Sequence, residues 1–311
     1  MHTIRVKLIW LRSKLNLARF LLRESVMARL GDRRQLRILF SRCYDTWDPQ
    51  IRQGFVHSRH QIFFGDLETE PLQNYDLVVP LSVRATLVLN ALPDATTNSL
   101  LPLPSNKCIF LCDDKYLLNT TLIELGFGEY IPRLLKDPAP PFILKKRIAE
   151  NSVDCHIVRS AADKLRLAPM IDSDEYFCQE LAQGQSEYAT HVLFRDGRIV
   201  TEVTVEYVSE HSDFIKGSES FIARNITRCP CTQPLERILA AIGYQGICCA
   251  NYKMVEGRLQ LIEINPRFGG SLGPLFFSFI RHLTHQPQPR GQRLAASVPA
   301  DQVAGTAPAG R

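Results

Sequence analysis

Apolar residues recur at steps of three and four in the first segment of the chain. The stripe consists of Leu8, Leu11, Leu15, Ala18, Leu22 and Val26. Residues at these steps lie on one face of an α-helix, so the pattern predicts an amphipathic helix within residues 1–35. Its many Lys and Arg residues leave two interpretations open. The helix either makes weak contact with an anionic membrane surface, a partner or a phosphate-rich ligand, or it packs on the next domain.

From residue 36 onward the apolar residues occur in short runs instead of at helical spacing. Three runs are typical of buried parallel strands, at 36–40, 61–64 and 76–81. Ser82 is a suitable N-cap for a helix that continues to Asn90. These elements predict a small, incomplete Rossmann-like α/β domain over residues 36–112. Because the segment has no G-x-G-x-x-G motif, we assign it no cofactor.

The segment 112–132 carries the clearest helix pattern of the chain. We expect Asp113 to cap this helix and Gly126 to end it. The apolar stripe would consist of Leu117, Leu118, Thr121, Leu122 and Leu125. Lys115 lies in the first turn, where the helix dipole disfavours a cation by ~0.3–1 kcal/mol. This makes Lys115 a candidate for binding an anion.

Strand patterns dominate the following segments. Residues 141–160 predict a strand with Lys145 near its end, a polar loop and a second strand, which together suit a hairpin folded over phosphates. Residues 175–200 contain two strand patterns, YFCQEL and SEYATHVLF, and a tight RDGR turn. Taken alone, Glu180 and Glu187 on these strands would be solvated residues.

Residues 247–265 predict a further hairpin that closes at Glu256-Gly257. Strict alternation on its second strand places on one face Leu259, Leu261, Glu263 and Asn265. Asn251 reaches that face if the loop has three residues, and the opposite face if the loop has two. A charged residue at the end of an apolar strand is costly to bury unless something pairs with it. The hairpin is therefore a candidate binding site with a definite register.

The net charge of +5 is concentrated in one segment. Residues 1–37 contain ten Lys or Arg and two acidic residues, a charge of +8 that leaves −3 for the remaining chain. A chain with this distribution is not broadly basic, so we expect no nucleic-acid partner. The pattern gives no indication of the oligomeric state.

Composition also bears on the location of the protein. No apolar run approaches the ~20 residues that span a bilayer, and the first residues do not have the pattern of a cleavable leader. The nine cysteines lack the Cys-x-x-Cys spacing of zinc sites, which indicates reduced thiols and a cytoplasmic protein. Residues 285–311 are rich in Pro, Gly, Ala and Gln, and we expect them to be disordered.

Four motifs occur in an order that resembles the ATP-grasp superfamily, the carboxylate–amine and carboxylate–thiol ligases. They are DDK at 113–115, FILKK at 142–146, QELAQGQSEY at 179–188 and IEINPRFGGS at 262–271. The resemblance covers residues 70–284 and implies an α+β ATP-grasp fold over residues 113–284. In this fold two lobes, here 113–178 and 179–284, clasp ATP between them. The Rossmann-like domain would precede them.

The resemblance implies a role for each polar residue of the motifs. Lys115 and Lys145 would hold the ATP phosphates as positive charges, and Lys145 would also assist catalysis. The backbone around Glu180 and Leu181 would contact adenine, with the Glu180 side chain near the amino group. Glu187 would accept hydrogen bonds from the ribose hydroxyls.

The last motif would hold the metal and the reacting groups. By the same resemblance, Glu263, Asn265 and Asn251 would be oxygen ligands of Mg²⁺ or Mn²⁺ bound to the phosphates. Arg267 would stabilise the transferred phosphoryl group and an acylphosphate. The turn after it, Gly269, Gly270 and Ser271, would let backbone N–H groups approach an anionic substrate.

The implied activity is an ATP-dependent ligase that joins a carboxylate, of an amino acid or a similar small molecule, to an amine through an acylphosphate. Three departures from the family pattern favour a non-catalytic ATP-binding relative instead. Asn251 stands where many relatives have an acidic ligand, the loop RIAENSV at 147–153 has no glycine, and the pattern turns low-complexity near residue 284. A third interpretation is a kinase that stops at phosphorylation.

Overall fold

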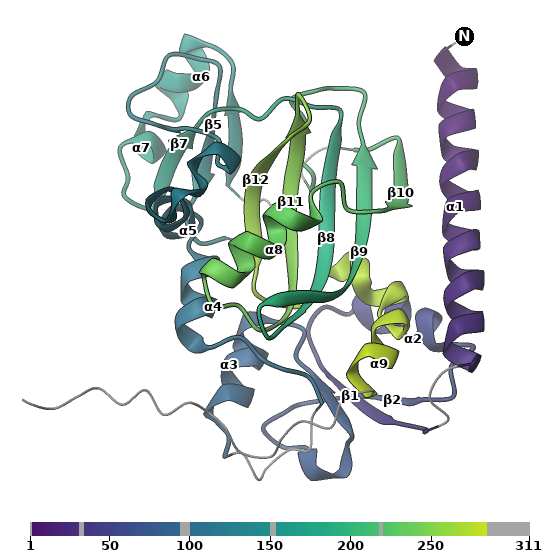
Figure 1. The fold of residues 1–311 in the computed structure, drawn as a ribbon. Helices are drawn as coiled ribbons and strands as arrows, with labels where there is room; N and C mark the ends of the chain where they lie inside the picture. The colour runs from purple at the N-terminus through teal and green to yellow at the C-terminus, as the bar shows by residue number, and fades with distance from the viewer. Residues whose placement is uncertain (1, 31–33, 94–99, 150–153, 218–219, 285–311) are drawn as a thin grey trace, which may run out of the picture.

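Three sheets follow one another along the chain (Figure 1). The structure is a computed structural model, and it describes residues 2–30, 34–93, 100–149, 154–217 and 220–284. The segment 285–311, predicted to be disordered, lies outside the described residues. The three sheets have three, four and five strands in chain order, and strands of the second and third contain residues of three of the four motifs.

The first sheet is parallel, as its short apolar runs predicted. Its strands are β1 (Arg37–Ser41), β2 (Gln61–Gly65) and β3 (Leu77–Val79), in the order β2-β1-β3. Helix α3 (Val83–Ala91) follows, and its N-cap Ser82 accepts a hydrogen bond from the Ala85 N–H at 3.1 Å. Helix α2 (Trp47–Phe55) was not predicted, and it buries Ile51 and Phe55.

The second sheet forms a small lobe with two short helices. Its strands are β4 (Leu134–Leu135), β5 (Phe142–Lys146), β6 (Cys155–Val158) and β7 (Tyr176–Gln179), in the order β4-β7-β5-β6. The helices are α6 (Ala161–Arg166) and α7 (Ala168–Ile171). The predicted hairpin β5–β6 is confirmed, and its loop residues 150–153 lie outside the described residues.

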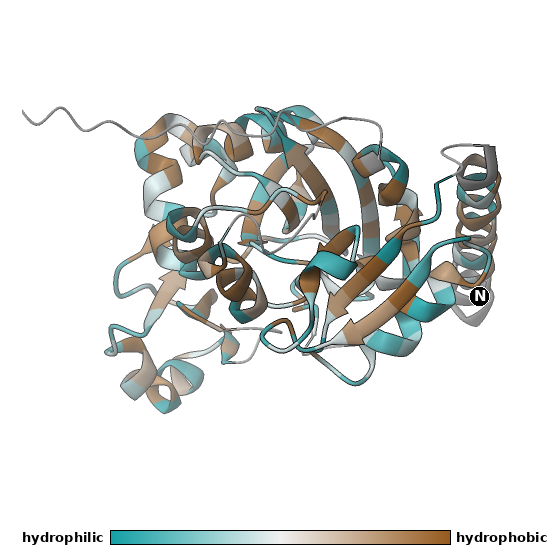
Figure 2. Cartoon of the chain, turned by 90° about the horizontal axis from the view of Figure 1, so that it is seen from below, coloured by the Kyte–Doolittle hydropathy of each residue, from teal (hydrophilic) through white to brown (hydrophobic). Residues whose placement is uncertain are grey.

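The third sheet is antiparallel and is the largest. Its strands are β8 (Ser186–Arg195), β9 (Arg198–Val208), β10 (Ala223–Thr227), β11 (Gly246–Val255) and β12 (Arg258–Asn265), in the order β10-β9-β8-β11-β12. The predicted RDGR turn joins β8 to β9, and Asp196 and Gly197 have the positive φ values, 53° and 80°, of a tight two-residue hairpin turn. Apolar residues run along its strands (Figure 2).

Both faces of the large sheet are covered. One face packs on α4 (Asn106–Asp113), α5 (Lys115–Leu122) and α8 (Thr232–Ala241), and the other on the first sheet and α9 (Phe277–Thr284). The neighbours Cys248 and Cys249 belong to opposite cores because successive strand residues point to opposite faces.

The predicted long helix at 112–132 begins later than expected. A separate helix, α4, ends at Asp113, so Asp114 caps α5 instead of Asp113. The Asp114 carboxylate accepts from the N–H groups of Tyr116 and Leu117 at 3.0 and 3.1 Å. The cap moves by one residue and leaves Lys115 as the first residue of α5.

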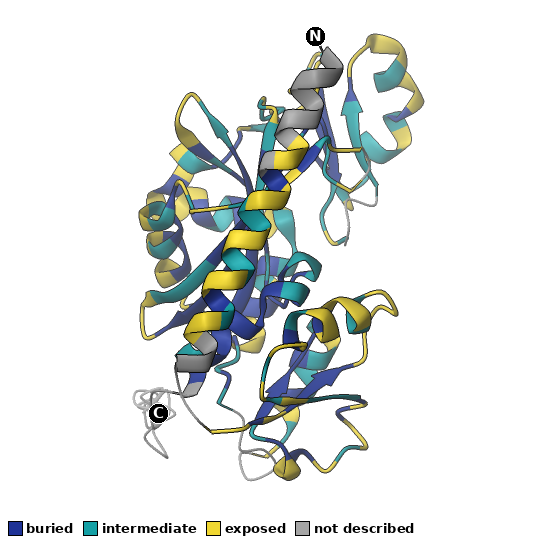
Figure 3. Cartoon of the chain, turned by 90° about the vertical axis from the view of Figure 1, so that its right-hand side faces the viewer, coloured by how far each residue is buried: buried dark blue, intermediate teal, exposed yellow. Residues whose placement is uncertain are grey.

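Helix α1 (His2–Leu30) stands along one side of the molecule, beside β10 (Figures 1 and 3). The helix is confirmed, but four residues of the predicted stripe are exposed and do not belong to the core, namely Leu11, Leu15, Leu22 and Val26. The body contacts the opposite side, where Leu17, Phe20 and Leu21 join the core. Both sides of the helix carry apolar residues, so spacing alone could not identify the packed one.

Two polar contacts fix the orientation of α1. The Ser13 hydroxyl donates a hydrogen bond to the Arg224 carbonyl in β10, and the buried Glu24 pairs with Arg281 of α9 at 2.8 Å.

Among the described residues, none of the helices combines the length and the apolar composition that a membrane span requires.

Candidate active site

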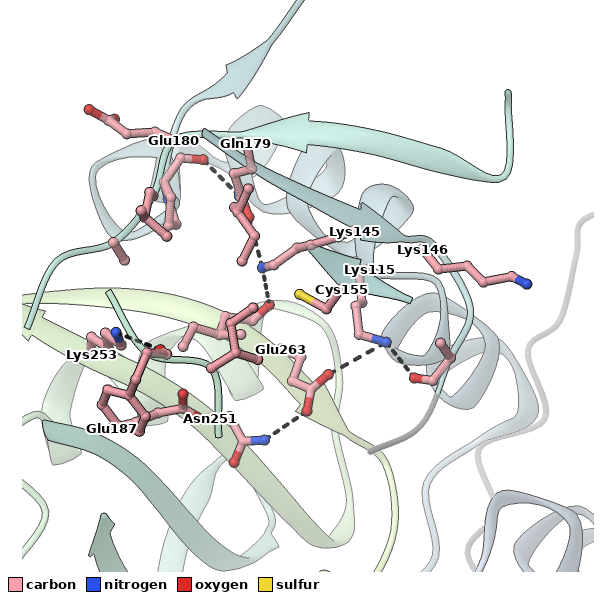
Figure 4. Close-up of a pocket in the computed structure, with 18 residues that line it drawn as sticks. Lys115, Lys145, Lys146, Cys155, Gln179, Glu180, Glu187, Asn251, Lys253 and Glu263 are labelled. Atoms are coloured by element: carbon pink, nitrogen blue, oxygen red, sulfur yellow. Dashed lines mark hydrogen bonds and ion pairs between the residues drawn. The ribbon is translucent and has the colours of Figure 1, made fainter. Parts of the chain in front are cut away.

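A pocket lies between the small lobe and the large sheet (Figure 4). It encloses about 720 Å³ of empty space, including its open mouth. Seven predicted site residues line it: Lys115, Lys145, Glu180, Leu181, Glu187, Asn251 and Glu263. They come from both lobes and are up to about 150 residues apart in the sequence, so the fold itself assembles the pocket.

Lys145 connects the two lobes across the pocket. It lies at the end of β5, is 5% exposed, and donates to Gln179 Oε1 of β7 at 2.9 Å. Its ammonium is also 3.5 Å from the Ile262 carbonyl of β12. Burial lowers the pKa of Lys145 from its ordinary value. A buried ammonium with neutral partners is well placed to bind an incoming anion.

Lys115 and Glu263 form an ion pair from opposite sides of the pocket. Lys115 Nζ is 3.5 Å from Glu263 Oε2 and donates to the Ala149 carbonyl at 2.6 Å. Burial alone would raise the pKa of Glu263, but Lys115, the Asn265 hydrogen bond, Lys216 and the Asn251 hydrogen bond outweigh burial and lower that pKa to about 2. Glu263 is therefore a carboxylate at neutral pH.

The β11–β12 hairpin places Asn251 directly opposite Glu263. Of the two loop lengths that the sequence left open, the structure has the two-residue turn, because Val255 pairs with Arg258. In a regular hairpin this turn would place Asn251 on the face opposite Glu263. A β-bulge between Asn251 and Tyr252 compensates by inserting one extra residue on the facing strand. The expected shared face of Asn251 and Glu263 is thus confirmed, through a feature that the loop length could not show.

The same bulge overturns the predicted alternation of β12. Leu259 and Leu261 pack in the helix-covered core with Ile264, whereas Glu263 faces the pocket. The extra residue is Ile262, which also lines the pocket, and its carbonyl is the one that Lys145 approaches. The bulge therefore shifts the polar end of the strand to the other face of the sheet.

Glu263 and the two amides beside it could offer oxygen atoms to a cation. The amides of Asn251 and Asn265 each donate to Glu263 Oε1, at 2.7 and 2.8 Å, and an amide that rotates presents its oxygen instead. One carboxylate with amide oxygens fits Mg²⁺, which takes one or two carboxylates, substrate phosphates and water. No group of three His, Cys, Asp or Glu suited to a metal occurs among the described residues.

Lys216 and Lys253 are polar residues of this region that the sequence analysis missed. Lys216 Nζ lies 3.5 Å from Glu187 and donates to Asn251 Oδ1 at 3.0 Å. Burial alone would lower the pKa of Lys216, but Glu187 and its other neighbours raise it. Lys253 lines the pocket, 2% exposed, and donates to the carbonyls of Ser212 and Phe214. Alternation on β11 puts Lys253 and Asn251 on one face, a signal that could have identified Lys253.

The expected adenine-binding segment lies at the end of β7. Glu180 and Leu181 line the pocket, and the Glu180 N–H donates to the Arg133 carbonyl at 2.8 Å. The Glu180 carboxylate pairs with the Arg133 guanidinium through two hydrogen bonds of 3.0 and 3.2 Å. Arg133 thereby lowers the pKa of Glu180, and a purine amino group would have to compete with Arg133 for this carboxylate.

Arg267 and the glycine turn lie beside the pocket, outside its lining. Arg267 is buried and donates to the Phe268 carbonyl at 3.1 Å. A Cβ on Gly269 would lie 2.6 Å from His191, and one on Gly270 would lie 2.9 Å from Trp47. The two glycines therefore permit tight packing of the turn, a reason different from the expected access to substrate.

His191 and Ser271 form a buried polar pair next to Arg267. His191 Nε2 is 2.7 Å from Ser271 Oγ. Burial, with the charges of Lys216, Arg224 and Arg267, lowers the pKa of His191 to about 3, so the ring is neutral. Three cations surround this neutral ring, which makes the region favourable for an anion.

No family model matches the sequence, and no curated protein matches it. Solved structures do match the fold. D-alanine–D-alanine ligase from Bacillus anthracis aligns at 12% identity and a TM-score of 0.52, over 80% of this chain and 97% of that one. N5-carboxyaminoimidazole synthase from Aspergillus clavatus was solved with ADP and 5-aminoimidazole ribonucleotide. It aligns at 16% identity and a TM-score of 0.54, over 82% of this chain and 78% of that one.

The L-amino acid ligase from Bacillus licheniformis is similar to a comparable degree, at 13% identity and a TM-score of 0.51, over 80% of this chain and 71% of that one. The chain has the ATP-grasp fold. The predicted ATP-grasp fold is thereby confirmed.

Proposed function

We propose that this chain is an ATP-dependent ligase that joins a small carboxylate to an amine through an acylphosphate. The observation that carries the proposal is the meeting of Lys145, Lys115 and Glu263 in one pocket between the ATP-grasp lobes. Two of the similar structures are ligases of D-alanine and of L-amino acids, which favours an amino acid or a similar small molecule as the carboxylate.

The contacts in the pocket suggest how ATP would bind. Lys145, which donates to neutral partners, and Lys115, which pairs with Glu263, would hold the phosphates. Glu180 and Leu181 at the lobe junction would contact adenine. Glu187 lies 5% exposed beside Lys216 and would accept hydrogen bonds from the ribose. An ATP-bound form of the B. anthracis ligase is among the similar structures, at 12% identity.

Glu263, Asn265 and Asn251 would hold Mg²⁺ or Mn²⁺ through their oxygens. When bound, such a cation neutralises charge on the phosphates. Lys115 and Glu263 pair with each other in this structure. In the proposed complex this ion pair would open, because the Glu263 carboxylate would bind the divalent cation and the Lys115 ammonium would bind a phosphate. Both groups keep an opposite charge nearby throughout, which limits the cost of their burial.

The proposed chemistry has two balanced steps. A substrate carboxylate oxygen attacks the γ-phosphorus, the bond to the β–γ bridging oxygen breaks, and ADP leaves. The amine nitrogen then attacks the acyl carbon, the C–O bond breaks, phosphate leaves, and the nitrogen loses a proton. Arg267 and Lys145 would stabilise charge on the transferred phosphoryl group, Arg267 from the turn beside the pocket.

A non-catalytic ATP-binding protein is the second candidate, and one observation favours it. Asn251 is tied to both Glu263 and Lys216, at 2.7 and 3.0 Å, so the cation site includes an amide where an acidic residue would bind more tightly. This second candidate retains the pocket and predicts ATP binding without turnover.

The test incubates the protein with ATP, Mg²⁺ and pools of amino acids and other small carboxylates and amines. A ligase releases ADP, phosphate and a product whose mass is that of the two substrates minus water. A kinase yields ADP and a stable phosphorylated product without free phosphate. A non-catalytic protein binds ATP but releases neither ADP nor phosphate. The Glu263→Gln variant serves as the control for contaminating ATPases.

A further inference from the structure

We propose that the outer face of α1 binds an anionic lipid surface. The face is defined by Leu11, Leu15 and Leu22, with exposed fractions of 51%, 50% and 69%. With about 3.6 residues per turn, these three side chains fall on one line along the helix. Apolar side chains this exposed, on a rigid element, indicate a surface that another apolar phase covers.

The charges beside this line are all positive. By helix position, Lys14 lies on one side of the three leucines, and Arg19 and Arg23 lie on the other, all exposed. Trp10 is 54% exposed on the Lys14 side and carries the Lys14 ammonium 5.4 Å from its ring centre. A leucine line flanked by cations is typical of helices that lie in the headgroup region of a membrane.

The acidic residue of the described α1 side chains, Glu24, is directed the other way. It is 5% exposed and pairs with Arg281 of the body at 2.8 Å. This contact and the packing of Leu17, Phe20 and Leu21 fix which side of α1 faces outward. The outer face therefore carries the three leucines and the three cations together, and none of the described side chains on it is acidic.

Charge complementarity selects the occupant of the face. A second copy would bring Lys14, Arg19 and Arg23 close to the same cations of its partner, which costs energy. A nucleic acid would satisfy the cations but offers little to three leucines. An anionic bilayer surface satisfies both, since its headgroups attract the cations and its acyl boundary takes the leucines.

The experiment measures sedimentation of the full-length protein with vesicles of phosphatidylcholine, alone or with about one-third phosphatidylserine. Two triple variants test the face: Leu11→Ser/Leu15→Ser/Leu22→Ser and Lys14→Glu/Arg19→Glu/Arg23→Glu. Matched controls remove three exposed apolar side chains and reverse three exposed charges elsewhere: Val56→Ser/Phe110→Ser/Leu165→Ser and Arg84→Glu/Lys107→Glu/Arg258→Glu. If the leucine variant fails to fold, Leu22→Ser alone, the most exposed position, replaces it.

We expect the wild type to bind the anionic vesicles, and each α1 variant to lose at least about tenfold in partition coefficient. The controls should bind like the wild type, and salt should weaken binding as the Debye length falls from about 10 Å at 0.1 M to about 3 Å at 1 M. Absence of wild-type binding, or equal binding by the leucine variant, would overturn the proposal. So would a wild-type dimer that the leucine variant converts to a monomer, or binding to a soluble polyanion in place of vesicles.

Discussion

Asn251 donates a 2.7 Å hydrogen bond to Glu263 directly across the β11–β12 pair. The amide thus fills the position next to the pocket carboxylate without adding a second negative charge. In the proposed enzyme this arrangement sets how strongly a divalent cation binds, because each added carboxylate raises the charge of the site.

We predict that Asn251→Asp lowers the melting temperature in the absence of divalent cations and that Mg²⁺ raises it by more than in the wild type. The new carboxylate repels Glu263 and loses the amide donor, and a cation between the two oxygens reverses both effects. Thermal melts with and without Mg²⁺ measure this.

A matched pair elsewhere in the large sheet provides the control. Asn225 donates to Glu206 at 3.0 Å across β10–β9, in the same cross-strand arrangement but away from the pocket. Asn225→Asp should also be destabilised, but without rescue by Mg²⁺. Equal rescue of both variants would mean that the cation effect is not specific to the pocket.

Glu263→Gln should abolish ATP turnover while the fold survives, because the amide has nearly the same volume but neither charge nor two acceptor oxygens. The pKa of Glu263 is lowered to about 2 in the folded protein, below the ~4.3 of an unfolded chain. Its charge therefore stabilises the fold above the unfolded value, and this contribution is lost as pH falls through the folded value.

The corresponding measurement is urea unfolding of the wild type and Glu263→Gln across the acid range. The difference in free energy of unfolding should be constant above about pH 5 and should shrink toward pH 2. A difference that does not change with pH would show that Glu263 is not held as a carboxylate by Lys115 and the two amides.

Arg267 and Lys145 should differ in which kinetic quantity they change. Arg267→Lys keeps a cation but loses the planar fork, so ATP affinity should change little while turnover falls by about 10²–10³. Lys145→Met should weaken ATP binding itself, because that ammonium would face phosphates already present in bound ATP. Calorimetric ATP affinity beside phosphate release separates the two effects, and the reverse pattern would show that the two roles are exchanged.

The glycine turn offers a stability test that is independent of ATP. A Cβ on Gly269 would lie 2.6 Å from the buried His191 ring, whereas one on Gly273 would lie 3.4 Å from Ile51. We predict that Gly269→Ala lowers the free energy of unfolding by about 1–3 kcal/mol, and that Gly273→Ala is much closer to neutral. Urea titration compares them, and equal effects would contradict the packing role of the turn.

The ordered motifs predicted the fold well because they reflect chemistry that one architecture assembles. Lys115, Lys145, Glu180, Leu181, Glu187, Asn251 and Glu263 all line one pocket, although they were identified from separate segments. The parallel first sheet and the RDGR hairpin were also predictable, since period and turn residues determine them locally. The roles assigned to these residues stay predictions.

The errors have physical causes that spacing does not record. The bulge at Ile262 changes which face Glu263 occupies, and nothing in the local sequence distinguishes it from regular alternation. Lys216 pairs with Glu187 and Asn251 through the tertiary fold alone. On α1, apolar residues on two sides left the packed face undetermined until Leu17, Phe20 and Leu21 were seen in the core.

The most direct test of the ligase mechanism follows oxygen from the substrate carboxylate. With the accepted carboxylate labelled with ¹⁸O, attack on the γ-phosphorus and later cleavage of the acyl C–O bond move one labelled oxygen into phosphate. Mass spectrometry of the released phosphate should therefore show one ¹⁸O per turnover, formed only when ATP, Mg²⁺ and the amine are all present. Release of unlabelled phosphate in step with formation of the amide product would contradict the proposed acylphosphate mechanism.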